Sequence, residues 1–470
     1  MNLASKLFKG DRVVWIIFMF LCLISAIEVF SATSTLAYKK EAYWEPIADH
    51  ATFLLGGFVL VLLLHNIHCR NYALLAGGAA VSVVLLVLLL LKIPGLVVVI
   101  NGEPRWMNIL GVTFQPSEIA KISLMAYTAF ILSKRRWFTD RQMFWWIQGA
   151  AFLICGLIVF TNGSTAILLF CIVQMMMFIG QISIMRLLKC WGTLLLILVT
   201  VITLLIAFPS VRKMDFMPKR VDTWIARIER WLGVEKEGQD AKTYKLKPSE
   251  IRVDGKIYDM DGEDHQVVHG KIAIARGGLW GNFPGHGRQR DFLPQAYSDF
   301  IYGIIIEEMG IAGGIFVLFL YMALLFRVGM IARKCDKLFP KFLVLGCGLM
   351  LGVHALTNMA VAVDLIPVTG QPLPLVSRGG TSTIISCAYI GIILSISRFS
   401  AYMGEEDEEP APAGDPMNDL PATGEHQVES GADPAEGGAA SAENKAGTPD
   451  GGFSPLESVV GQKEETINRT

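Results

Sequence analysis

Ten apolar runs, each free or nearly free of charge, recur along the chain between polar segments of very different lengths. Most approach the length that an α-helix needs to cross a bilayer, about 17 to 25 residues. Lipid offers no partner for backbone amides, so such runs are expected to be helical. The pattern predicts an all-α polytopic membrane protein with about ten transmembrane helices, near residues 13–30, 51–64, 72–91, 119–132, 144–160, 165–184, 191–208, 300–325, 342–363 and 381–396.

The short connections that are rich in Lys and Arg all fall on one side of this topology. The positive-inside rule assigns that side to the cytoplasm. Because the number of spans is even, both termini are expected there too. These basic clusters precede the first run and follow the fourth, sixth and eighth, at residues 6–12, 134–141, 186–189 and 333–341.

Three segments on the opposite side, 101–118, 209–297 and 364–380, are expected to be extracellular. The middle one, between the seventh and eighth spans, is far longer than packing requires. Within it, apolar residues recur at helical spacing over 221–232, which favours a helix on the membrane surface or one packed on the rest of the loop. Residues 234–264 lack periodicity and are interpreted as a mobile insert without chemistry. The glycines of 272–287 are too dense for a stable helix; they permit either close approach to a ligand or a tight turn.

Composition supports a membrane protein and shows that the C-terminal residues differ from the rest of the chain. Hydrophobic residues make up 53% of the chain, and the mean hydropathy is +0.47, which excludes an ordinary soluble protein. Residues 402–470 hold 16 acidic and 3 basic residues among many Pro, Gly, Ala and Ser, a composition typical of disorder. Since the whole chain carries −1 and this tail −13, the membrane body 1–401 carries +12, which suits anionic lipid headgroups.

Charged residues inside or beside the spans point to a site, because a charge in the bilayer is costly unless it is paired or wetted. Glu118 and Lys121, three residues apart, share a helix face. They form either a structural ion pair or a ligand contact. Pro116 marks a helix start just before them, and a helix amino end attracts anions. Glu307 and Glu308 form a second charged group, in the eighth run.

Asp299 opens the eighth run at the expected outer membrane edge, where it could serve as a helix N-cap or carry chemistry. The Pro/Gly-rich residues 367–380 precede the last run. Irregular backbone at this depth must be buried or line a cavity, so the segment borders a site or packs as a re-entrant loop. The eight cysteines include no CxxC pair, so neither a disulfide framework nor a metal site is predicted.

Four motifs in order resemble those of the FtsW/RodA family, the SEDS proteins of shape, elongation, division and sporulation. They are GEPRWMNILGVTFQPSEIAK at 102–121, NGSTA at 162–166, GGLWG followed by LPQAYSDFIYGIIIEEMG within 277–310, and IPVTGQPLPLVSRGGTS at 366–382. Two departures from the family pattern stand out. Asn162 replaces the usual Asp, and Arg378 replaces the usual Tyr of the last motif.

The resemblance implies a peptidoglycan glycosyltransferase of the bacterial cytoplasmic membrane that polymerises lipid II, an undecaprenyl-pyrophosphate-linked disaccharide-peptide, at the outer face. It further implies Asp299 as the general base, while Arg105 and Lys121 bind the pyrophosphate and Glu118 orients Lys121. From the fourth motif, Ser377, Gly379 and Gly380 complete the substrate-binding set. The implied partner is a class B penicillin-binding protein, a transpeptidase, together with other division proteins and membrane lipids; nucleic acid is not expected.

Several alternatives stay open. Arg378 either adds a cation near the pyrophosphate or faces outer water, whereas His354 and Asn358 are interpreted as helix-packing polar residues. A lipid II flippase and an inactive scaffold are rival functions. The long acidic tail and the overall pattern favour septal synthesis in cell division over an elongation-type, RodA-like role. A divalent cation, Mg or Mn, could accompany the pyrophosphate, but no ligand cluster is visible.

Overall fold

Each of the ten predicted runs is a helix in the computed structural model. The structure describes residues 8–33, 45–100, 103–109, 111–207, 250–253, 256–259, 265–293 and 297–406. The ten helices are α2 (Arg12–Ala32), α4 (Glu45–Leu64), α5 (Leu74–Leu90, preceded by the 3-10 turn η1, Cys69–Ala73), α6 (Pro116–Ser133), α7 (Asp140–Val159), α8 (Gly163–Ile179), α9 (Ile184–Ala207), α13 (Ile301–Arg333), α14 (Leu338–Ala362) and α15 (Thr381–Glu406).

Side chains at the helix starts explain where several of these elements begin. Asp11 caps α2 by accepting from the amides of Val13 and Val14. Thr139 and Gln142 form a reciprocal capping box at the start of α7. Pro116 occupies the first turn of α6, where its missing amide proton is not needed.

Seven of the described helical segments are long and apolar enough to cross a membrane, judged by length and composition alone. They are Arg12–Ala32, Ile47–Leu64, Cys69–Leu90, Asp140–Val159, Ile301–Arg333, Leu338–Ala362 and Thr381–Phe399. Helix α8 is apolar but shorter. The predicted helical, polytopic architecture is therefore confirmed.

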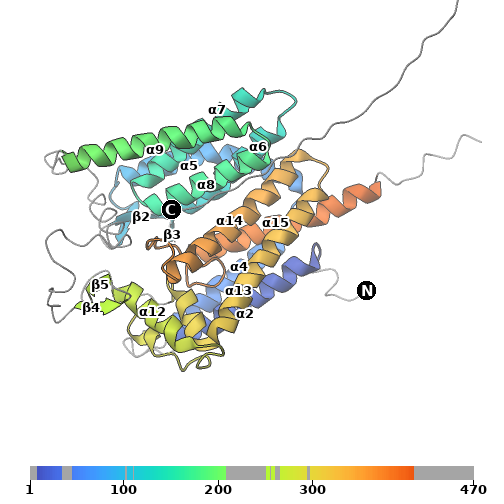
Figure 1. The fold of residues 1–470 in the computed structure, drawn as a ribbon. Helices are drawn as coiled ribbons and strands as arrows, with labels where there is room; N and C mark the ends of the chain where they lie inside the picture. Colours follow the sequence, from blue (N-terminus) through green and yellow to red (C-terminus); the bar gives the residue numbers. More distant parts are fainter. Residues whose placement is uncertain are drawn as a thin grey trace, which may run out of the picture. The chain divides into compact units, whose positions relative to one another are not determined.

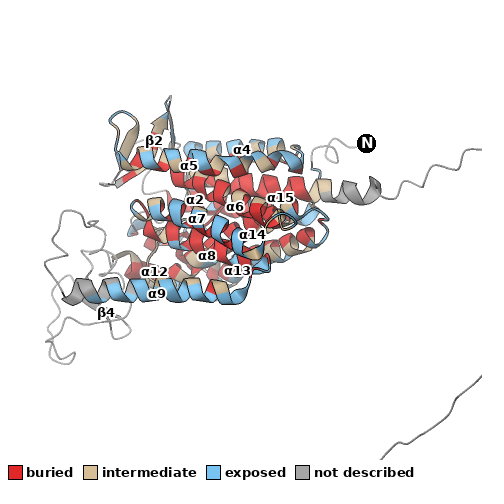
Figure 2. Ribbon diagram, turned by 90° about the horizontal axis from the view of Figure 1, so that it is seen from above, coloured by how far each residue is buried: buried red, intermediate tan, exposed pale blue. Residues whose placement is uncertain are grey.

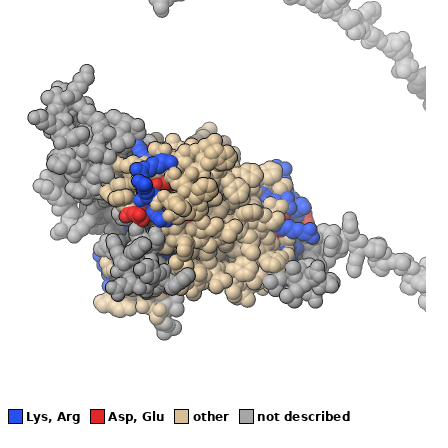
Figure 3. Space-filling view, turned by 90° about the horizontal axis from the view of Figure 1, so that it is seen from below, with Lys and Arg blue, Asp and Glu red and all other residues tan. Residues whose placement is uncertain are grey.

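The helices pack around a central group formed by α6, α14 and α15 (Figure 1). Helix α14 contacts α6, α8, α13 and α15, while α4 lies along α15 and α5 along α6. Buried residues concentrate in this group, whereas α9 is exposed along most of its described length (Figure 2). On the face shown in Figure 3, charged side chains gather at two ends with an uncharged surface between them. We call the end at which α6 and α13 begin and α14 finishes the site end.

Two connections contain strands that the sequence did not predict. Strands β1 (Val97–Ile100), β2 (Glu103–Ile109) and β3 (Val112–Phe114) form an antiparallel sheet in the order β1-β2-β3. Strands β4 (Glu250–Val253) and β5 (Lys256–Asp259) pair as a hairpin within residues 234–264, the stretch interpreted as a mobile insert. The helix predicted over 221–232 lies outside the described residues.

The glycine-rich region 272–287 is only partly non-helical. Helix α12 (His265–Gly277) covers its beginning, so the expectation that the glycines prevent a helix was wrong for residues up to 277. A turn follows, leading to the 3-10 helix η2 (Gln289–Asp291). Helix α12 packs along the first part of α13.

The eighth predicted run, 300–325, is longer than expected and is not one continuous helix. Helix α13 is broken at Gly310, whose φ of 75° and ψ of 179° are not helical. Chain contacts divide the protein into residues 1–409 and 410–470. Helix α15 continues to Glu406, past the predicted start of the tail at 402, and residues after 406 lie outside the described part of the chain.

Candidate active site

Asp299 lies in the turn immediately before α13. The N-cap residue of α13 is Phe300, which makes no side-chain cap, so the N-cap interpretation of Asp299 was wrong. The Asp299 carboxylate accepts a hydrogen bond from Ser298 Oγ at 2.9 Å. Its side chain is half-buried, so a substrate can reach it while protein still surrounds it.

The backbone around Asp299 is held from two other elements. The carbonyls of residues 297–299 accept, in order, from the Arg378 amide at 2.9 Å, Ser377 Oγ at 2.6 Å and Asn358 Nδ2 at 2.9 Å. Three successive carbonyls outside a helix would otherwise need solvent as their donor. Donors from α14 and from the 364–380 loop therefore fix the backbone that carries Asp299.

The 364–380 loop folds into the protein interior beside Asp299. Leu373, Leu375 and Val376 are almost fully buried. Gly370 has a positive φ of 66°, and a Cβ placed on it would lie 3.6 Å from Asp299 Oδ2. The loop therefore packs as a re-entrant segment and also borders Asp299, as the Pro/Gly pattern predicted.

Gln371 links this loop to two further helices. Its Oε1 and His354 Nε2 are 2.9 Å apart, and its Nε2 donates to Thr165 Oγ1 on α8 at 2.9 Å. Its carbonyl accepts from Asn358 Nδ2 at 2.8 Å. His354 and Asn358 thus bind protein groups, which confirms their interpretation as packing residues. The motif residue Asn162 caps α8, since its Oδ1 accepts from the Thr165 amide at 3.3 Å, a bond that the usual Asp could also make.

Lys121 and Glu118 form a buried ion pair on α6. Lys121 Nζ and Glu118 Oε1 are 2.7 Å apart, and Lys121 is only 2% exposed. Helix α6 packs against α14, which carries His354 and Asn358 of the Gln371 network. The predicted pairing of Lys121 and Glu118 is confirmed, and the pair lies next to the elements that hold Asp299.

The other predicted site residues lie on strand β2 and at the end of the 364–380 loop. Arg105 lies half-buried on β2, which packs against α5 and α6. Ser377 is 2% exposed, and its hydroxyl also accepts from the Leu373 amide at 2.7 Å. Gly379 and Gly380 accept from Ser382 and Thr383 as the chain enters α15.

Arg378 makes contacts that neither open alternative anticipated. Its guanidinium pairs with Asp49 on α4 at 3.3 Å and lies over the Tyr297 ring at 5.5 Å. With its amide on the Tyr297 carbonyl, Arg378 ties α4 to the turn that carries Asp299.

The break at Gly310 is matched by the glycine-rich turn after α12. The first amides of a helix have no partner within it. Here the amides of Ile311 and Ala312 donate to the carbonyls of Gly278 and Leu279, at 2.9 and 3.2 Å. On the other side of the break, the Glu307 carbonyl accepts from the Asn282 amide at 3.1 Å. One turn therefore caps both halves of α13.

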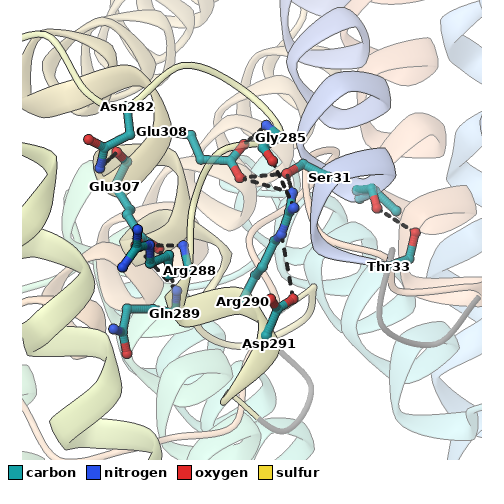
Figure 4. Close-up of polar contacts among 11 residues, drawn as sticks. Ser31, Thr33, Asn282, Gly285, Arg288, Gln289, Arg290, Asp291, Glu307 and Glu308 are labelled. Atoms are coloured by element: carbon teal, nitrogen blue, oxygen red, sulfur yellow. Dashed lines mark hydrogen bonds and ion pairs between the residues drawn. The ribbon is translucent and has the colours of Figure 1, made fainter. Parts of the chain in front are cut away.

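Two fully buried glutamates just before the break hold the segment that leads to Asp299. Figure 4 shows Glu307 directed towards residues 288–289 and Glu308 towards Gly285, Ser31 and Arg290. Glu307 accepts from the amides of 288 and 289 at 2.9 to 3.2 Å. Glu308 accepts from Ser31 Oγ at 2.5 Å and from Arg290 Nη1 at 3.5 Å. These bonds join α2, η2 and α13 into one support for the turn at 297–300.

Close backbone packing at Gly281 makes it sensitive to substitution. A Cβ there would collide with the Glu308 carbonyl and the Gly310 amide, whereas Gly278, also at positive φ, has open space around it. Gly281→Ala should therefore lower the melting temperature of the purified protein much more than Gly278→Ala, which adds only backbone strain of about 1 kcal/mol. Equal melting temperatures for the two variants would contradict the capping role of this turn.

Sequence reasoning missed Gln371, Thr165, Ser31 and Arg290 as parts of the site. Gln371 and Thr165 stand inside recognised motifs, and their polar side chains within apolar surroundings were an available signal. Ser31 and Arg290 gave none, because Ser31 lies 277 positions from Glu308 and 259 positions from Arg290, its two partners. No three His, Cys, Asp or Glu residues of the described ranges are placed to hold a metal ion.

Comparisons with known proteins agree on one relationship. Residues 11–402 match the family model FtsW/RodA/SpoVE, described as cell cycle protein. The probable peptidoglycan glycosyltransferase FtsW of Hahella chejuensis is 29% identical over 77% of this chain and 83% of its own length. That of Trichlorobacter lovleyi is also 29% identical, over 83% of this chain and 94% of its own.

Solved structures show the same fold. A chain of a peptidoglycan synthase complex, studied for the structural coordination of polymerization and crosslinking, matches 83% of this chain and 98% of its own, with a TM-score of 0.59 and 21% identity. The rod shape determining protein RodA of Thermus thermophilus matches 83% of this chain and 97% of its own, with a TM-score of 0.54 and 20% identity.

Proposed function

Because this chain belongs to the FtsW/RodA/SpoVE family of cell cycle proteins, we propose that it is a peptidoglycan glycosyltransferase that polymerises lipid II into glycan strands. The chain is a multi-pass membrane protein. The observation that carries the assignment is Asp299, half-buried at the site end, with its backbone held by three donors from separate residues. Such positioning is what general-base catalysis requires.

In the proposed reaction, a hydroxyl of the acceptor sugar attacks the anomeric carbon of the donor sugar. Asp299 accepts the hydroxyl proton while the new glycosidic bond forms. The bond between the anomeric carbon and the pyrophosphate oxygen breaks, and its electron pair leaves with undecaprenyl pyrophosphate. A single displacement of this kind inverts the anomeric configuration.

Cations are needed where negative charge develops on the leaving pyrophosphate. Lys121 would supply a point charge and Arg105 a bidentate donor, with Glu118 holding Lys121 in place. The Ser377 hydroxyl is engaged with two backbone groups, so we assign it a positioning role beside Asp299. Gly379 and Gly380 allow the chain to enter α15 next to this site, and no step of the proposal passes through a metal ion.

The distribution of basic residues supports an outward-facing Asp299. Lys134, Arg135 and Arg136 follow α6, and Arg333 and Lys334 end α13, so these basic residues lie at the end of the bundle opposite the site end. By the positive-inside rule that end faces the cytoplasm, with both termini. The site then faces the leaflet in which the lipid-linked substrate is consumed.

The test is polymerisation of lipid II by the purified chain together with a class B penicillin-binding protein. This partner is proposed because the similar synthase complex coordinates polymerization with crosslinking. A flippase is the alternative of another class, and it would move lipid II across sealed vesicles without the partner. Translocation without polymerisation would refute the proposal.

A septal role is proposed from the similarity to relatives named FtsW. Depletion of the protein in its own cells should then give filaments. Rounded cells would instead indicate an elongation-type role.

Arg378 provides a test of whether a cation at this position binds substrate. If Arg378 acts through Asp49 and Tyr297, then Arg378→Ala and Asp49→Ala should lower kcat of polymerisation to a similar small extent, since a partly exposed pair contributes about 1 kcal/mol or less. KM for lipid II should stay unchanged in both. A raised KM in Arg378→Ala alone would show direct pyrophosphate binding.

A further inference from the structure

Large apolar side chains are exposed in the turn that follows α12. Leu279, Trp280 and Phe283 are 60%, 77% and 75% exposed. The backbone of the same turn is fixed by its hydrogen bonds to α13. A rigid turn that presents three large apolar side chains marks an interaction surface rather than a loop in water.

The backbone hydrogen bonds define where this turn lies along the membrane span. Gly278 and Leu279 accept from the amides of Ile311 and Ala312, which form the first turn of α13 after its break. From Ile311 onwards the helix is long enough to cross a bilayer. The turn therefore lies level with the end of a span, the depth at which Trp residues gather in membrane proteins.

The exposed turn continues an apolar surface of α13. Exposed apolar residues recur three or four positions apart along this helix, at Ile311, Ile315, Phe319, Met322 and Phe326. Such a stripe on a spanning helix faces lipid. Leu279 adjoins the Ile311 end of the stripe through its bond to the Ala312 amide, so the apolar surface extends beyond the span.

Basic side chains flank the turn. Arg276 and Arg288 are exposed, and neither is in an ion pair within the described part of the chain. Guanidinium groups bind phosphates in bidentate fashion, and basic residues beside a span attract anionic headgroups. Aromatic side chains next to exposed arginines are the combination that suits the bilayer boundary.

We propose that residues 278–283 form an interfacial membrane anchor. Leu279, Trp280 and Phe283 lie at the boundary between headgroups and acyl chains, and Arg276 and Arg288 contact phospholipid phosphates. Because this turn caps α13 on both sides of Gly310, the anchor also sets the depth of the short helix that follows Asp299. This second part rests on the proposed function, since depth matters only if Asp299 acts on a substrate held in the same leaflet.

The anchor is tested by photocrosslinking in lipid nanodiscs of phosphatidylethanolamine and phosphatidylglycerol. Benzoylphenylalanine is placed at position 280 or 283 of the full chain, with His286, exposed and polar in the same segment, as the matched control position. Mass spectrometry should find phospholipid adducts at 280 and 283 and several-fold fewer at 286. Absence of lipid adducts at 280 and 283, or adducts mainly to a second protein, would overturn the proposal. This readout does not depend on catalysis.

The effect on depth is tested by Trp280→Gln and Trp280→Tyr. In bilayers the first variant should polymerise lipid II several-fold more slowly than wild type, and the second should retain most activity because Tyr also favours the interface. In detergent, which has no leaflet to define depth, the wild-type protein and both variants should polymerise lipid II at the same rate. An equal loss in detergent would show a purely structural role and contradict the depth effect.

Discussion

Asp299→Asn is expected to slow glycan-strand formation by about 10²- to 10⁴-fold, the usual contribution of one positioned acid–base group. The amide keeps the size and the hydrogen bond to Ser298 but cannot accept a proton. The initial rate of lipid II polymerisation by the purified protein with its transpeptidase partner measures the effect. Its melting temperature should stay near that of wild type, since the amide has the same size and still accepts from Ser298.

Asp364→Asn is the matched control for this experiment. Asp364 follows the end of α14 and pairs with Lys271 at 2.8 Å, but it is partly exposed, and its side chain bonds to none of the residues that hold the backbone around Asp299. The control should polymerise at the wild-type rate. Full activity of Asp299→Asn would refute the assigned base, whereas continued lipid II translocation without polymerisation by either variant would favour the flippase.

Breaking the buried pair on α6 should have the second largest effect. Lys121→Met leaves Glu118 without its partner, and Glu118→Gln does the same to Lys121. Removing one member of a buried ion pair costs about 3–5 kcal/mol, so each single variant should unfold at clearly lower denaturant concentration. Both should also lose polymerisation, because the proposed pyrophosphate contact is removed or misplaced.

The double variant Lys121→Met/Glu118→Gln separates structure from substrate binding. With both charges replaced by neutral groups of similar size, most of the lost stability should return. Activity should stay low, since no cation faces the leaving group. A double variant that is both stable and active would show that Glu118 and Lys121 form only a structural ion pair. That was one of the two alternatives left open by the sequence, the other being contact with a ligand.

The helices were predictable because their signal is strong and local. A long apolar run can satisfy its backbone in lipid only as a helix, so all ten runs were placed correctly. The β1–β3 sheet and the β4–β5 hairpin were missed because short strands depend on cross-strand pairing that hydropathy does not display. Gly310 was missed because one glycine within an apolar run does not by itself indicate a break.

The segments that form the candidate site were predictable from the sequence, but the hydrogen bonds that connect them were not. The motifs led to Asp299, Lys121 and the 364–380 loop, and the structure brings Asp299 and the loop into contact. The connecting residues were not visible because their bonds join distant parts of the chain. Gln371 donates to Thr165, and Ser31 donates to Glu308, each pair separated by more than 200 positions.

The break in α13 also bears on how the chain enters the membrane during synthesis. Read as one helix, this segment would carry Glu307 and Glu308 into the bilayer, where charged side chains oppose insertion, by about 2.5 to 3.5 kcal/mol each at the centre and by less towards the ends. The break at Gly310 removes both carboxylates from the segment that the insertion machinery must partition into lipid. What remains, from Ile311 to Phe326, contains no charged residue. The same glycine that lets the turn cap both half-helices thereby makes the eighth span easy to insert.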